Sequence, residues 1–220
     1  MMSPREIRVY RDLMGDNETW AGETRTVLGA HGIVMLNLIG SPGAGKTRLL
    51  ESMVKPLEGR ARFATLEGDV ETTRDAERLA ALGVEVSQLL SGGSCHLEAK
   101  MVHQALTDLP VDNLDLVFVE NVGNMVCPAE FDLGEQAKVA VLSVTEGEDK
   151  PLKYPLLFRE AKALVLTKVD LLPHLEFNLP LCLQNIRTVN ADLPVFQVSA
   201  QTGEGVDRWT QWVVEHLTNS

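Results

Sequence analysis

The stretch Gly40-Ser41-Pro42-Gly43-Ala44-Gly45-Lys46-Thr47 determines how the rest of the sequence is interpreted. Its spacing, G-x-x-x-x-G-K-[ST], is that of a phosphate-binding loop. In such a loop backbone N–H groups surround the phosphates, the lysine reaches the β- and γ-phosphate oxygens, and the hydroxyl can ligate Mg²⁺. An apolar run over residues 33–39 precedes it and apolar residues at helical spacing follow it, as the motif requires. All eight residues are therefore predicted to bind a nucleotide, and Lys46 is also predicted to be catalytic.

Short apolar runs alternate with amphipathic segments from residue 33 onward. The apolar runs predict strands over residues 33–39, 61–66, 84–89, 115–119, 138–144, 163–167 and 194–198. The amphipathic segments predict helices over residues 46–55, 71–81, 96–108, 176–190 and 205–217. Because most of the runs are apolar throughout, the strands should be buried on both faces of a mainly parallel sheet. The predicted fold is an α/β, doubly wound P-loop domain with helices on both faces.

Residues 1–30 are predicted to form a helical appendage that packs on this domain, which is expected to cover residues 31–220. Apolar spacing within the appendage predicts two helical pieces, one over about residues 7–14 and one over residues 16–28. A chain of 220 residues suits one α/β domain.

The composition limits the classes of partner and the location. With a net charge of -11, the chain is not expected to bind nucleic acid, because neutralising phosphates requires a basic face. The N-terminus has no apolar signal-like run and no window is long enough to span a bilayer, so no membrane association is expected and the predicted location is cytoplasmic. Three cysteines are too few for a disulfide framework, so a functional thiol is expected to be a ligand or a nucleophile.

A carboxylate follows one of the predicted strands. The apolar run over residues 116–119 ends in Glu120, and Gly123 follows three residues later. An acid at that edge of the sheet can hold Mg²⁺ or its water ligands beside the phosphate loop. We therefore predict that Thr47 and Glu120 bind Mg²⁺ and that Glu120 contributes to catalysis, the alternative being an acid that merely begins a loop.

Two further motifs favour GTP over ATP. The sequence Thr167-Lys168-Val169-Asp170 is close to the guanine signature N-K-x-D. The Asp170 carboxylate can accept hydrogen bonds from both N1–H and N2–H₂ of guanine, whereas adenine offers no such pair of donors. Threonine in place of asparagine at 167 is expected to weaken a supporting hydrogen bond. The second motif, Ser199-Ala200-Gln201, follows a predicted strand where GTPases keep a loop under the base.

Cys95-His96 and Cys127 are the candidate ligands of a second metal. Gly92 and Gly93 lie upstream of the first pair and provide an irregular backbone on which adjacent residues can face one ion. Two thiolates and an imidazole suit Zn²⁺ or Ni²⁺ rather than Mg²⁺. From the residues alone, inert buried thiols remain the favoured alternative. Cys182 is predicted to lie in the core, and His103 is expected at the surface.

Several longer motifs resemble one family. They are Leu66-Glu67-Gly68-Asp69-Val70, Asp75-Ala76-Glu77-Arg78, Cys95-His96-Leu97-Glu98-Ala99, Glu120-Asn121-Val122-Gly123-Asn124-Met125-Val126-Cys127-Pro128-Ala129, Phe131-Asp132-Leu133-Gly134-Glu135 and residues 143–155. Together they are similar to the HypB family of hydrogenase maturation GTPases, over about residues 16–217. The resemblance implies a SIMIBI-class GTPase that dimerises with GTP, hydrolyses it slowly and delivers nickel to the large subunit of a [NiFe]-hydrogenase. It also implies a small zinc-binding chaperone as a partner, and Cys95, His96 and Cys127 as Ni²⁺ or Zn²⁺ ligands at the subunit interface.

The chain departs from the family pattern at some positions. Ser91 and Gly92 replace the usual entry to the Cys-His pair, and no Cys-rich or His-rich nickel-storage tract is seen, so no storage role is expected. Asp69 and Asp75 follow the second predicted strand, where a switch segment would respond to the γ-phosphate and Mg²⁺. Both are candidate catalytic residues, and which of them contacts Mg²⁺ is left open.

Two alternatives to this function remain. One is a nickel- or zinc-binding scaffold in which the nucleotide site is largely structural. The other is a GTPase of the same class that serves urease or a cobalamin mutase. The arrangement of Cys-His and Cys-Pro differs from the Cys-Pro-His motif of the urease type, which counts against the second alternative.

Overall fold

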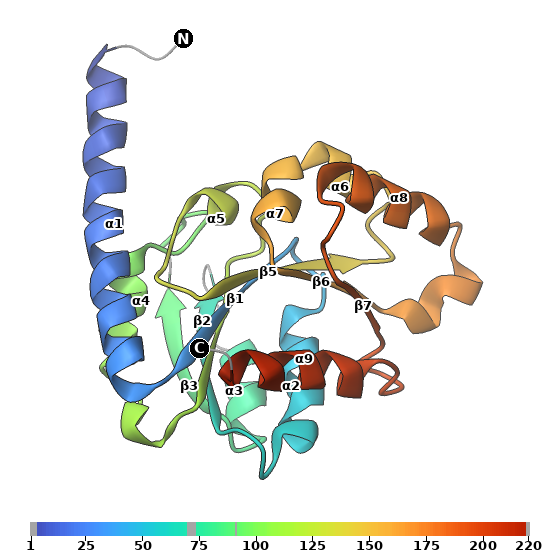
Figure 1. The fold of residues 1–220 in the computed structure, drawn as a ribbon, viewed down its shortest axis with the longest axis horizontal. Helices are drawn as coiled ribbons and strands as arrows, with labels where there is room; N and C mark the ends of the chain where they lie inside the picture. The colour runs from blue at the N-terminus through green and yellow to red at the C-terminus, as the bar shows by residue number, and fades with distance from the viewer. Residues whose placement is uncertain (1–3, 70–73, 91, 219–220) are drawn as a thin grey trace.

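The structure, a computed structural model, describes the backbone of residues 4–69, 74–90 and 92–218, and within these ranges the side chains of residues 14–68, 74–90 and 92–216. Its centre is a seven-stranded, all-parallel sheet with the strand order β3-β2-β4-β1-β5-β6-β7 (Figure 1). The strands are β1 (Val34–Ile39), β2 (Phe63–Asp69), β3 (Glu85–Leu90), β4 (Leu116–Glu120), β5 (Ala137–Ser143), β6 (Ala163–Thr167) and β7 (Val195–Val198). Each predicted strand is therefore present, and the predicted α/β doubly wound fold is confirmed.

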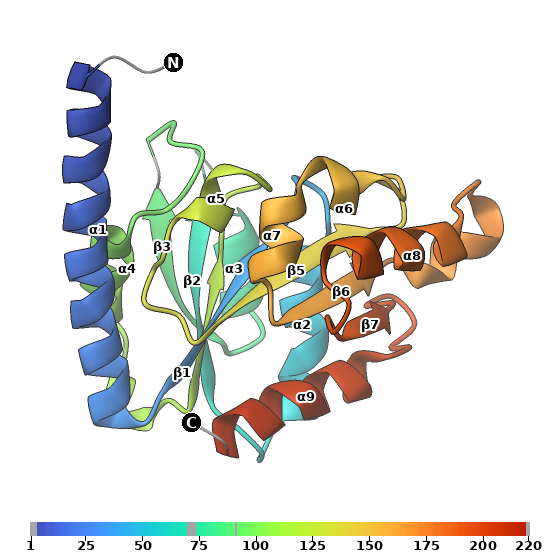
Figure 2. The same cartoon turned by 45° about the horizontal axis from the view of Figure 1, so that its top comes forward.

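Helices cover both faces of the sheet. They are α1 (Pro4–His31), α2 (Lys46–Leu57), α3 (Arg74–Ala80), α4 (Ala99–Leu106), α5 (Cys127–Glu130), α6 (Lys150–Lys153), α7 (Pro155–Glu160), α8 (Leu179–Val189) and α9 (Val206–Thr218), with 3₁₀ turns η1 (Val111–Asn113) and η2 (Val169–His174). In Figure 2, α2, α3 and α9 lie on one face, while α1, α4, α5, α7 and α8 lie on the other. Every residue of β1, β4 and β6 is buried, because apolar strands of a parallel sheet are covered on both sides.

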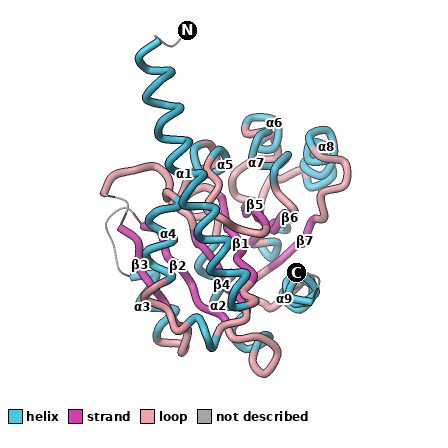
Figure 3. The backbone as a smooth tube through the Cα atoms, turned by 60° about the vertical axis from the view of Figure 1, so that its left-hand side comes forward, coloured by secondary structure: helices cyan, strands magenta, loops and turns pink. Residues whose placement is uncertain are grey.

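The N-terminal region is one helix rather than two pieces. Helix α1 runs through Gly15 and Asp16 without a break, so the prediction of separate segments is wrong at this point. A glycine inside a helix costs about 1 kcal/mol relative to alanine and does not by itself end the helix. The C-terminal half of α1 packs along α4 and buries Leu28 in the core, while its N-terminal half extends beyond the rest of the fold (Figure 3).

Other helix predictions were wrong in extent. The helix expected over residues 96–108 begins at Ala99, so the Cys-His pair lies in the preceding loop. Helices α5, α6 and α7 were not predicted, because segments of four to six residues are too short to show a helical period. Among the described residues, no helix combines the length and the apolar character that a membrane span requires.

The order of the strands brings the candidate site residues to one edge of the sheet. The phosphate loop follows β1, Glu120 ends β4, and Thr167 ends β6. Parallel strands end at a common edge, and ligands of open α/β sheets bind outside that edge.

Candidate nucleotide-binding and metal sites

A cavity of about 420 Å³ lies between the phosphate loop and the ends of β2 and β4. It is lined by Pro42, Gly43, Gly45, Lys46, Thr47, Arg48, Glu67, Gly68, Asp75, Arg78, Glu120, Asn121, Val122 and Gly123. Two glycines fix the shape of the loop. Gly45 precedes α2 with a φ of 92°, which favours glycine, and a Cβ on Gly40 would lie 2.3 Å from the carbonyl oxygen of Val141. The remaining loop residues, Ser41 and Ala44, belong to the same turn, which is closed by a hydrogen bond from the Ala44 N–H to the Ser41 carbonyl oxygen.

Lys46, Thr47 and Glu120 form the polar centre of this cavity. Thr47 Oγ1 donates a hydrogen bond of 2.8 Å to Glu120 Oε1, and Lys46 Nζ lies 3.4 Å from the carbonyl oxygens of Gly40 and Ser41. Burial lowers the pKa of Lys46. Burial also raises the pKa of Glu120 to about 7, an effect that Lys46 and Thr47 only partly offset.

The donor atoms at this centre fit Mg²⁺. Oε2 of Glu120 is buried and has no hydrogen-bond partner among the described residues, and a buried carboxylate oxygen without a partner is costly. A hydroxyl and a carboxylate side by side are hard oxygen ligands of the kind that Mg²⁺ prefers.

The two acids predicted to follow the second strand lie on different elements: Asp69 is the last residue of β2, and Asp75 lies on α3. Asp75 lines the cavity, whereas the side chain of Asp69 lies outside the described residues. Glu67 was not singled out from the sequence, yet it is 2% exposed, lines the cavity and pairs in register with Glu120 across β2 and β4. The sequence did contain a signal for Glu67, because the alternation of a strand places residues 67 and 69 on the same face. It was missed because the second strand was expected to end at residue 66, three residues before the end of β2.

A second cavity, of about 260 Å³, adjoins the first and contains the candidate base-binding motifs. It is lined by Gly45, Arg48, Leu49, Thr167, Lys168, Asp170, Leu171, Val198, Ala200 and Gln201. Ser199 does not line it. That side chain is fully buried and accepts a hydrogen bond of 3.1 Å from the Thr202 N–H, so it shapes the loop instead.

Thr167 and Lys168 connect the candidate base-binding loop to the phosphate loop. Thr167 Oγ1 donates a hydrogen bond of 2.6 Å to the carbonyl oxygen of Ala44, and Lys168 Nζ donates one of 2.7 Å to that of Gly43. Thr167 therefore still supplies a hydrogen bond to the phosphate loop, although the N-K-x-D signature has asparagine at this position.

Cys95, His96 and Cys127 converge beyond the ends of β3 and β4. One ligand atom from each lies within 4.8 Å of the others. The two Sγ atoms are 3.0 Å apart, and Cys95 Sγ is 3.6 Å from His96 Nδ1. Cys95 is exposed and Cys127 is half-buried, so the alternative of buried, inert thiols is wrong for this pair. Cys182 is fully buried, as predicted, and burial raises its pKa to about 11.

The surroundings of His96 favour metal binding. Its ring stacks on Phe131 with the centroids 3.9 Å apart, and burial lowers its pKa, which favours the neutral imidazole that ligates metals. His103, expected at the surface, is instead half-buried, and its ring packs against Trp20 with the centroids 5.1 Å apart.

Asparagine side chains connect the cavity beside the phosphate loop to the candidate metal ligands. Asn121 follows Glu120 directly and is 1% exposed. Its Oδ1 accepts hydrogen bonds from the N–H groups of Val122, at 3.0 Å, and of Leu97, at 3.4 Å. Asn124 Nδ2 donates a hydrogen bond of 3.1 Å to the carbonyl oxygen of Cys95. The segment between Glu120 and Cys127 therefore contacts the backbone on both sides of His96.

Comparisons with known proteins show the family of the chain. Residues 34–197 match the family described as CobW/HypB/UreG, nucleotide-binding domain. The hydrogenase maturation factor HypB of Azotobacter vinelandii is 49% identical over 211 residues, which are 95% of this chain and 69% of that protein. HypB of Escherichia coli K12 is 46% identical over 213 residues, 97% of this chain and 73% of that one.

A solved structure is similar to the chain over most of its length. The crystal structure of HypB from Helicobacter pylori in complex with nickel has a TM-score of 0.89 and 33% identity, and the match covers 93% of this chain and 96% of that one. The chain therefore belongs to the CobW/HypB/UreG nucleotide-binding family and, within it, to the HypB hydrogenase maturation factors.

Proposed function

We propose that this protein is a cytoplasmic, GTP-hydrolysing metallochaperone that helps insert nickel into the large subunit of a [NiFe]-hydrogenase. The observation that carries the proposal is the link through Asn121, which follows Glu120 in the phosphate cavity and accepts a hydrogen bond from the N–H of the residue after His96. A nucleotide-dependent shift of Glu120 would therefore reach the metal ligands directly.

GTP is the proposed nucleotide. Asp170 lines the second cavity, where its carboxylate would accept the N1–H and N2–H₂ groups of guanine. Ala200 and Gln201 would lie along the base, and Arg48, which lines both cavities, would lie near the phosphates.

Hydrolysis would depend on charge stabilisation around the phosphates. Thr47 and Glu120 would hold Mg²⁺, which neutralises phosphate charge when bound. Lys46 would stabilise the negative charge on the β- and γ-phosphate oxygens. Glu67 and Asp75 would order water beside the γ-phosphate, and we assign Asp69 to the same switch region.

Nickel is the proposed cargo of the second site. Two thiols and one imidazole suit Ni²⁺ and also Zn²⁺. Three protein ligands leave a four-coordinate ion one ligand short, and the second subunit of a GTP-favoured homodimer, or water, would supply it. A small zinc-binding maturation chaperone and the hydrogenase large subunit are the proposed partners in transfer.

Complementation tests this function. When the gene for HypB is deleted in Azotobacter vinelandii, whose HypB is 49% identical, expression of this chain should restore nickel content and activity of the [NiFe]-hydrogenase. The empty vector is the control. A hydrogenase that stays nickel-free while the folded protein accumulates would contradict the proposal.

A further inference from the structure

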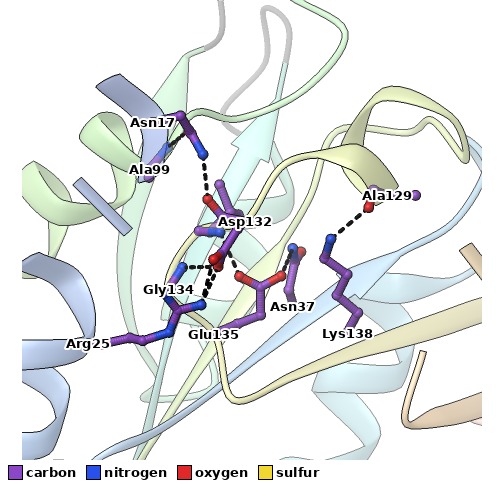
Figure 4. A network of polar contacts seen from close by, with 10 residues as sticks. Asn17, Arg25, Asn37, Ala99, Ala129, Asp132, Gly134, Glu135 and Lys138 are labelled. Atoms are coloured by element: carbon purple, nitrogen blue, oxygen red, sulfur yellow. Dashed lines mark hydrogen bonds and ion pairs between the residues drawn. The ribbon is translucent and has the colours of Figure 1, made fainter. Parts of the chain in front are cut away.

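Asn17, on the N-terminal helix α1, makes two hydrogen bonds to separate parts of the chain. Its Oδ1 accepts a hydrogen bond of 2.9 Å from the Ala99 N–H, and its Nδ2 donates one of 2.7 Å to the carbonyl oxygen of Asp132 (Figure 4). The residue is 5% exposed. A buried amide whose oxygen and nitrogen are both paired holds one orientation.

Both partners of Asn17 lie on segments that carry metal ligands. Ala99 is the first residue of α4 and comes three residues after His96. The first N–H groups of a helix have no partner within the helix, and the preceding residue, Glu98, supplies no side-chain cap. Asn17 therefore caps α4 from another helix.

The second partner lies on the segment of Cys127. Asp132 comes five residues after Cys127 and directly follows Phe131, the residue that stacks on His96. The hydrogen bond to the Asp132 carbonyl oxygen therefore fixes the backbone that places this ring. Asn17 itself belongs to neither ligand-bearing segment.

The loop around Asp132 is also held by a second residue of α1 and by a residue of the sheet. Arg25 of α1 pairs with both Asp132 carboxylate oxygens, at 2.6 and 2.7 Å. Glu135 accepts hydrogen bonds from the Leu133 N–H, at 2.6 Å, and from Asn37 Nδ2 on β1, at 3.2 Å. Figure 4 shows these contacts as one network between α1 and the sheet.

We propose that Asn17 is a positioning residue for the metal site. It ties the Cys95-His96 segment and the Cys127 segment to one rigid helix, and so keeps the three ligand atoms together before a metal arrives. Helix α1 is then part of the metal site and not only an appendage. The identity of the metal as nickel rests on the proposed function, whereas the positioning of the two thiols by Asn17 does not.

A metal-free measurement tests the positioning. Diamide oxidises two thiols to a disulfide and takes up their two hydrogens as a hydrazine, so the rate of Cys95–Cys127 disulfide formation reports how often the Sγ atoms meet. Asn17→Ala should slow this rate by about tenfold, because preorganised groups react faster than mobile ones. Cys182 is fully buried and should not react. Mass spectrometry after alkylation counts the remaining thiols.

Three other variants separate positioning from loss of folding. Thr19→Ala removes an exposed hydroxyl of α1 whose one hydrogen bond within the described part of the chain is to the Gly15 carbonyl oxygen, and this variant should react at the wild-type rate. Arg25→Ala leaves both Asn17 hydrogen bonds in place and should react faster than Asn17→Ala. Asn17→Asp keeps an acceptor for the Ala99 N–H but places a carboxylate oxygen against the Asp132 carbonyl oxygen, so its rate should also fall below that of wild type. Binding of a GTP analogue at wild-type affinity shows that each variant is folded.

Metal titration completes the test. Ni²⁺ affinity, followed by thiolate-to-nickel charge-transfer absorption, should fall by about 10- to 100-fold in Asn17→Ala, the range seen for outer-shell partners of metal ligands. A wild-type disulfide rate in Asn17→Ala, or an equal loss in Arg25→Ala, would overturn the assignment. A slowed disulfide rate in a protein whose wild type does not bind Ni²⁺ would support positioning while contradicting the proposed cargo.

Discussion

Phosphate release from GTP should fall by about 10²- to 10³-fold when Lys46 is replaced by alanine, as for other enzymes that lose one preorganised charge-stabilising group. The Lys46 side chain is buried among carbonyl oxygens of the phosphate loop, and Thr47 and Glu120 line the same cavity. Arg48 and Arg78 also line that cavity, but both form ion pairs with Glu51. They therefore cannot simply replace Lys46. Turnover is measured with saturating GTP and Mg²⁺, so that weaker binding does not hide the chemical step.

Asp170→Asn provides a matched control in the other cavity. The asparagine amide can donate to the C2 carbonyl of xanthine, where guanine has an amino group. This variant should therefore bind and hydrolyse XTP at a rate close to that of wild type with GTP.

Wild-type GTP turnover in Lys46→Ala would remove the phosphate loop from the mechanism.

Replacing Cys127 by alanine should weaken Ni²⁺ binding by more than about 100-fold, since even outer-shell partners of metal ligands contribute 10- to 100-fold. The Cys127 thiol is 3.0 Å from the Cys95 thiol. The hydrogen bond with that thiol and, to a smaller extent, burial raise the pKa of Cys127. Binding of a GTP analogue should be unchanged, because Cys127 lines neither nucleotide cavity. Equilibrium dialysis gives the metal affinity.

Cys182→Ala is the control for the loss of a thiol as such, since Cys182 is buried among apolar residues of α7 and α8 and is not one of the three clustered ligands. It should keep wild-type Ni²⁺ affinity. Full nickel binding by Cys127→Ala would mean that the ion is held elsewhere.

The sequence predicted the sheet well because the signal for a buried strand is local. Most strands are short apolar runs, and β1, β4 and β6 are buried along their whole lengths. The same reasoning placed the phosphate loop, Glu120 and Thr167 at one edge, because parallel strands end together. By contrast, α5 has four residues, which is too few to show periodicity.

The polar connections within the site could not be predicted in the same way. Asn17 bonds to residues 82 and 115 positions away, and Asn121 to a residue 84 positions away. In a single sequence such an asparagine resembles any other polar residue, and only the packing of α1 and β1 brings the partners together. Glu67 was missed for a simpler reason, since β2 extends to Asp69, beyond its expected end.

We propose that the nucleotide state controls metal affinity through the segment between Glu120 and Cys127. These residues are separated by six others, among them Asn121, whose side chain bonds to the Leu97 N–H. The direct measurement is Ni²⁺ titration of the protein bound to GDP and bound to a non-hydrolysable GTP analogue. We predict affinities that differ by about 5- to 150-fold, and by reciprocity the metal should change the relative affinity for the two nucleotides by the same factor. Equal metal affinities in the two nucleotide states would contradict the coupling.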